Sequence, residues 1–68
     1  MYKYVAIKVA GADLSDQESD YFSEIMYAME WLQNNFETTK EKYFIVNLIN
    51  KTVTEFRPIV DKVKFEAI

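Results

Sequence analysis

Cysteine and histidine are both absent from the 68 residues of this chain. Without them the chain forms no disulfide and has no Ser-His or Cys-His nucleophile. It also lacks the side chain that most often serves as a general acid or base in enzymes, which is histidine. A domain this short that also lacks a zinc staple must be held together by its apolar core or by a partner subunit. The sequence therefore predicts a single domain over residues 1–68 that is not an enzyme and holds no cofactor or metal.

Long apolar runs are also missing. No stretch approaches the length of a membrane span, and the apolar residues from Val5 to Ala12 are interrupted by Lys8. That interrupted stretch is too short for the apolar region of a secretory signal. We therefore expect a cytoplasmic protein that has no membrane partner.

Positive charge is missing from residues 9–39, which hold seven acidic side chains and no lysine or arginine. All eight basic residues lie outside this segment. Segregation of this kind favours an acidic surface that meets a basic partner. The alternative is that lysines of the flanking strands, such as Lys40 and Lys42, neutralise the segment.

Apolar side chains recur at helical spacing from Ser15 to about Glu37, the segment around which the predicted fold is arranged. They form one stripe, at steps of three and four residues, made of Phe22, Ile25, Met29, Leu32 and Phe36. Ser15 followed by Glu18 has the spacing of a capping box. The pattern predicts one long helix whose apolar stripe packs on a sheet.

The other segments are typical of strands, either alternating or apolar on both sides. Strands are predicted at Tyr2 to Ala10, Tyr43 to Ile49, Val53 to Arg57 and Lys62 to Ile68, with a hairpin turn at Asn50-Lys51. The residues expected to meet the helix are Val5, Ile7, Val9, Val46 and Phe56. The result is an α+β fold in the order β-α-β-β-β, with one long helix packed across one face of a small, mostly antiparallel sheet.

A second stripe lies opposite the apolar one on the predicted helix. It consists of Asp20, Glu24, Tyr27, Trp31 and Asn34. Tryptophan and tyrosine are enriched in interface hot spots, and carboxylates speed the encounter with a basic surface. We therefore predict a protein-binding module or inhibitor that presents this stripe to another protein with a basic surface. Small acidic proteins of phages and mobile elements that inhibit nucleic-acid-acting proteins offer a class analogy. The alternative is that the C-terminal segment folds over the two aromatic residues.

Two other functions stay open. The far face of the predicted sheet would carry tyrosines and lysines suited to nucleic acid, together with Ile45. These residues are Tyr2, Tyr4, Lys8, Tyr43, Ile45, Lys62 and Lys64. The strand that begins at Tyr43 is apolar on both sides, which is compatible with a homodimer that buries Tyr43, Ile45 and Ile49.

Overall fold

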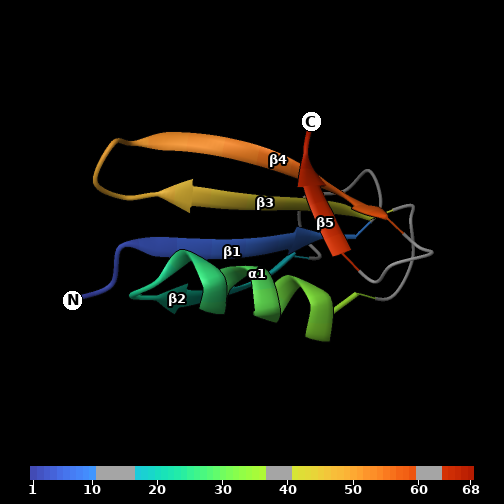
Figure 1. Cartoon of the computed structure of the whole chain (residues 1–68), viewed down its shortest axis with the longest axis horizontal. Coiled ribbons are helices and arrows are strands. Elements are labelled where there is room, and N and C mark those ends of the chain that lie inside the picture. Colours follow the sequence, from blue (N-terminus) through green and yellow to red (C-terminus); the bar gives the residue numbers. More distant parts are fainter. Residues whose placement is uncertain (11–16, 37–40, 60–63) are drawn as a thin grey trace.

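The computed structural model describes residues 1–10, 17–36, 41–59 and 64–68 of the chain. Its elements are β1 (Tyr4–Val9), β2 (Gln17–Phe22), α1 (Ile25–Asn34), β3 (Lys42–Asn47), β4 (Thr52–Ile59) and β5 (Lys64–Ala67). The strands form one antiparallel sheet in the order β2-β1-β3-β4-β5, and α1 lies across one face of it (Figure 1). The prediction of a small α+β domain with one helix on an antiparallel sheet is confirmed.

The predicted order β-α-β-β-β is wrong in one respect, because a second strand precedes the helix. Gln17–Phe22, expected to be helical, forms β2 and pairs with β1. Serine and aspartate are weak helix formers, and the aromatic pair Tyr21-Phe22 favours a strand. Pairing with β1 also provides backbone hydrogen bonds to residues 17–22, and the spacing of apolar side chains along the sequence gives no sign of them. Glu24 is the N-cap residue of α1, whereas the expected helix boundaries, Ser15 and Glu37, fall outside the described ranges.

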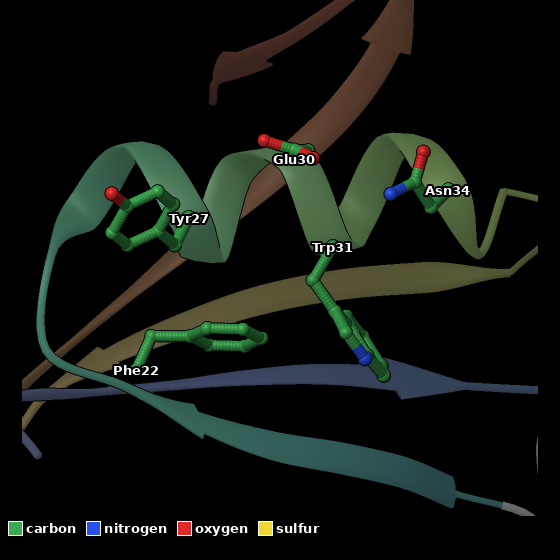
Figure 2. Close-up of a pocket in the computed structure, with 5 residues that line it drawn as sticks. All are labelled: Phe22, Tyr27, Glu30, Trp31 and Asn34. Carbon is green, nitrogen blue, oxygen red and sulfur yellow. The ribbon is translucent and has the colours of Figure 1, made fainter.

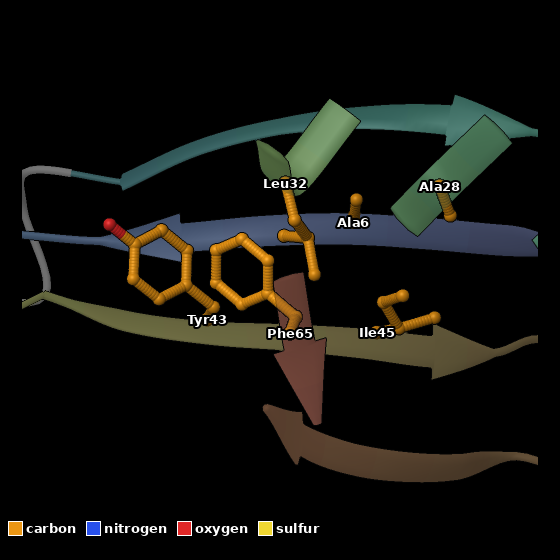
Figure 3. Close-up of a cluster of buried hydrophobic side chains, with 6 residues drawn as sticks. All are labelled: Ala6, Ala28, Leu32, Tyr43, Ile45 and Phe65. Atoms are coloured by element: carbon orange, nitrogen blue, oxygen red, sulfur yellow. The ribbon is translucent and has the colours of Figure 1, made fainter. Parts of the chain in front are cut away.

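The helix covers the opposite face of the sheet from the one predicted. The buried core consists of Ala6, Ala28, Leu32, Tyr43, Ile45 and Phe65 (Figure 3). Val5 and Val46 pair with each other on β1 and β3, one position away from Ala6 and Ile45. Because neighbouring residues in a strand point to opposite faces, Val5, Ile7 and Val46 lie on the face away from α1.

Small residues explain why the helix lies on this face. Ala6 of β1 and Ala28 of α1 are both fully buried, so the helix packs there without a large side chain between the two backbones. Beside them the rings of Tyr43 and Phe65 meet edge to face, with centroids 4.8 Å apart. This is a favoured geometry for an aromatic pair. Phe56 packs against the same core, as expected.

The change of face removes residues from two of the predicted surfaces. Tyr43 and Ile45 are 0% and 3% exposed, and Lys8 is 4% exposed. Because these side chains are buried, they cannot present a nucleic-acid surface or a dimer interface, so these placements are wrong. Tyr4 is half-buried against the core. The remaining members of the two predicted sets are Tyr2, Ile49 and Lys64, which are exposed, and Lys62, which lies outside the described residues.

Lys8 connects three parts of the fold beneath the end of α1. Its Nζ lies 3.3 Å from Oε2 of Glu18 in β2 and 3.7 Å from Oε2 of Glu41, just before β3. It also donates a hydrogen bond of 3.2 Å to the carbonyl oxygen of Asn35, the C-cap of α1. The negative end of the helix dipole favours a cation there. A lysine is seldom buried unless it is paired, and these contacts provide the pairing.

We expect Leu32→Ala to lower the free energy of unfolding by about 2–5 kcal/mol, because it leaves a cavity in a close-packed core. Ile25→Ala is the matched control, since Ile25 belongs to the same predicted stripe but is 43% exposed. Its effect should stay below about 1 kcal/mol. Urea denaturation followed by circular dichroism measures both. Equal losses would mean that α1 is rotated so that Ile25 faces the sheet.

We expect Lys8→Met to lower the free energy of unfolding by about 3–5 kcal/mol, because a buried carboxylate loses its counter-charge. The Glu41 side chain is only 8% exposed. Adding Glu41→Leu to Lys8→Met should restore part of the loss, since no unpaired charge is then buried at that position. The exposed Lys42 is the control, and Lys42→Met should change stability by at most about 0.5 kcal/mol. If Lys8→Met lowered the free energy of unfolding no more than Lys42→Met, the contacts of Lys8 would contribute little to the stability of the fold.

Candidate functional site: a groove between α1 and β2

Three members of the predicted binding stripe are brought together by α1. Tyr27, Trp31 and Asn34 lie on neighbouring turns of the helix, as predicted. All three line one groove beside the sheet (Figure 2). Trp31 points from the helix toward the sheet and is half-buried against the core. Tyr27 is 53% exposed.

These three side chains line a groove together with Phe22 and Glu30. The groove has a volume of about 300 Å³. Figure 2 shows the Phe22 ring extending from the end of β2 beneath the helix, between Tyr27 and Trp31. Glu30 and Asn34 also line the groove and are exposed, so their polar groups are accessible to solvent. The site therefore combines aromatic walls with an exposed carboxylate and an exposed amide.

The short connection from β2 to α1 places Phe22 beside the helix. Ser23 and Glu24 separate strand from helix, and the extended backbone of Glu24 (φ −128°, ψ 144°) begins α1. At the other end, both the backbone N–H and the side-chain Nδ2 of Asn35 donate to the carbonyl oxygen of Trp31, at 3.0 and 2.8 Å. These bonds hold the last turn, and with it the backbone that carries Trp31.

Asp20 and Glu24 are not wall residues of the groove. Asp20, expected on the helix, lies on β2 opposite Ala6, two positions before Phe22 and on the side of the sheet that α1 covers. Its Oδ1 accepts a hydrogen bond of 2.8 Å from the backbone N–H of Tyr21. Glu24 is the exposed N-cap of the helix. The five predicted site residues are therefore split between a helix and a strand.

Phe22 and Glu30 were missed as site residues. Helical spacing placed Phe22 in the apolar stripe of a longer helix, whereas Phe22 is the last residue of β2. Residues 17–22 show no alternation of apolar and polar side chains that would have marked a strand, although Glu18, Asp20 and Phe22 occupy one side of it. Read as a strand, this segment puts an aromatic ring and two carboxylates beside the helix.

Aromatic faces next to carboxylates provide an environment for a cation. The ring faces of tryptophan, tyrosine and phenylalanine attract ammonium and guanidinium groups within about 6 Å. Glu30 adds a negative charge to the lining, and no lysine or arginine occurs in residues 17–36. Among the residues with described positions, no cluster of three potential metal ligands is found. Across the same ranges of the chain, no helix is long and apolar enough to span a membrane.

In comparisons with protein-family models, curated proteins and solved structures, no match to the chain was found.

We expect Trp31→Ala to destabilise the fold by about 1–3 kcal/mol, because the indole packs partly against the core. Trp31 was expected in the stripe opposite the apolar one, whereas its indole is half-buried against the core. Tyr27→Ala, at the more exposed wall, should cost at most about 0.5 kcal/mol. Urea denaturation followed by circular dichroism tests both variants. A Trp31→Ala variant as stable as the parent would show that the indole does not support the helix.

Proposed function

We propose that this protein is a non-enzymatic binding module that takes a cationic side chain of another protein into the groove between α1 and β2. The observation that carries the proposal is the groove itself, in which Phe22, Tyr27 and Trp31 surround a space whose charged wall residue is Glu30. Arginine fits this chemistry better than lysine, because its planar guanidinium stacks on aromatic rings and is less strongly hydrated.

Energetically, the aromatic walls would provide the main attraction. A cation over an aromatic ring gains about 0.5–1 kcal/mol when exposed and about 2 kcal/mol when it is desolvated. The half-buried position of Trp31 between helix and sheet favours the desolvated case. Tyr27 is exposed and can close over a bound group with little loss of stability. These rings correspond to the central anchors of an interface.

The surrounding carboxylates would speed the encounter with the partner. Asp20, Glu24 and Glu30 are exposed, and none of them has an ion pair among the residues with described positions. Glu18 differs from them, since it is bonded to Lys8. Exposed charges raise association rates and are screened by salt. A basic partner would therefore associate more slowly as the ionic strength rises.

The class of partner follows from the same charges. Basic surfaces are common on proteins that act on nucleic acids, where they contact phosphates. An acidic module that occupies such a surface would act as an inhibitor by competing with the phosphate backbone. The segregation of seven acidic residues into positions 9–39 supports this role.

We expect N-acetyl-arginine amide to bind in the groove with an affinity of roughly millimolar, as is reasonable for a single anchored side chain. Binding should shift the NMR resonance of the Trp31 indole N–H in a saturable manner. Tyr27→Ala should weaken the binding by about 2- to 30-fold, the equivalent of a cation–π contact. N-acetyl-glutamate amide should produce no saturable shift.

Tyr2→Ala is the matched control, because Tyr2 is an exposed tyrosine that packs on Tyr21 and does not line the groove. It should leave the arginine titration unchanged. The proposal fails if the arginine probe causes no saturable shift. It also fails if Tyr2→Ala and Tyr27→Ala weaken binding equally.

A further inference from the structure

We propose that the partner's basic segment is extended and adds to the edge of β2 as an antiparallel strand, which places alternate side chains beside the groove. This inference rests on the proposed function and specifies how the partner binds. It concerns main-chain hydrogen bonds along the edge of β2, which are not needed when the groove takes up a single cationic side chain.

The hydrogen bonds of β2 show which of its backbone groups are available. β2 is the first strand in the sheet order, with β1 on one side only. The N–H of Lys3 donates to the carbonyl oxygen of Phe22 at 2.9 Å, so Phe22 turns its backbone toward β1. In an antiparallel pair these directions alternate along the strand. Asp20 and Glu18 therefore also turn toward β1.

It follows that Gln17, Ser19 and Tyr21 turn their N–H and C=O groups away from the sheet. An independent contact agrees, because the N–H of Tyr21 donates to its neighbour Asp20 through the side-chain Oδ1 at 2.8 Å. All three residues are exposed. β2 thus offers an edge along which another strand can form main-chain hydrogen bonds.

The side chains of an added strand would reach the groove. Residues directly opposite each other in neighbouring strands point to the same face. A residue placed opposite Asp20 or Phe22 would therefore lie on the face that carries α1, since Ala6 and Tyr4 are the partners of these two residues on β1 and Ala6 is buried under the helix. The side chain opposite Phe22 can enter between Tyr27 and Trp31, and those two and four positions away would meet Asp20 and Glu18.

Charge decides between a second copy of this chain and a basic partner. Two β2 edges paired with each other would bring Glu18 and Asp20 of both copies together, and like charges opposite each other destabilise a sheet. Acidic side chains therefore protect this edge from self-association. A strand with arginine at alternate positions would instead face those carboxylates. At the other edge, β5 carries Lys64 and Glu66, and Glu66 is paired with Arg57 of β4, so this edge lacks the acidic character of β2.

The test uses a synthetic peptide with alternating arginine and valine, Ac-RVRVRVR-NH₂, and two N-methylated forms. In antiparallel addition the arginines lie opposite Glu18, Asp20 and Phe22, and the valine N–H groups point to β2. Methylation of the valine nitrogens should weaken binding at least about tenfold, the equivalent of one to two lost hydrogen bonds. Methylation of an equal number of arginine nitrogens should leave the affinity unchanged. Isothermal titration calorimetry measures all three peptides.

Ser19→Pro tests the same edge from the side of the protein. It removes an N–H that points away from β1, and proline is tolerated at such positions of edge strands. Ser19→Ala is the control, and NMR spectra of both variants confirm that the fold is kept. Ser19→Pro should weaken the arginine–valine peptide at least about tenfold and leave the binding of N-acetyl-arginine amide unchanged.

The outcomes separate the two proposals. If both methylated peptides bind as tightly as the parent, or if Ser19→Pro binds the peptide as Ser19→Ala does, strand addition is overturned and the groove's uptake of a cation stands. If only methylation of the arginines weakens binding, the antiparallel direction is overturned. A peptide that binds independently of Tyr27, with no response to N-acetyl-arginine amide, overturns the proposed function but leaves the β2 edge as a strand-binding site.

Discussion

The buried ammonium group of Lys8 is the contact on which the arrangement of the other elements depends. It binds Glu18 of β2, the C-terminal carbonyl of α1 at Asn35, and Glu41 before β3. A buried charge must be paired, so these three segments have to converge on it. In a domain without a disulfide or zinc, the pairing of Lys8 adds to the constraints that a small core places on the fold. It specifies which face of β1 lies under the helix, since Lys8 and Ala6 are on the same side of the strand.

The groove is a consequence of that arrangement. The segment before the helix pairs with β1 as a strand, with Glu18 beside Lys8, and the turn at Ser23 and Glu24 then sends α1 back over the sheet. Had residues 15–37 formed one helix, Phe22 and Trp31 would be carried by one element, with no opening between strand and helix. The aromatic walls therefore exist only because two elements meet there, and the acidic residues of both are concentrated along one edge.

Several features could be predicted from local sequence. Leu32 and Met29 pack toward the sheet, as helical spacing indicated. The hairpin lies where Asn50-Lys51 predicted it, with Lys51 at a φ of 57°. The side-chain Oδ1 of Asn47 accepts the N–H groups of Ile49 and Asn50, at 2.9 and 3.0 Å. These features depend on residues close together in the chain, and local contacts are what periodicity and turn chemistry describe.

The sequence by itself determined the α+β class, the helix around Leu32, the β3–β4 hairpin and the acidic character of residues 9–39. Only the tertiary structure decided that Gln17–Phe22 is a strand and that Ala6, not Val5, faces the helix. Both sides of β1 are apolar enough to be buried, so alternation cannot choose between them. The choice was made by partners distant in the chain, namely the close packing of Ala6 with Ala28 and the pairing of Lys8 with Glu18 and Glu41.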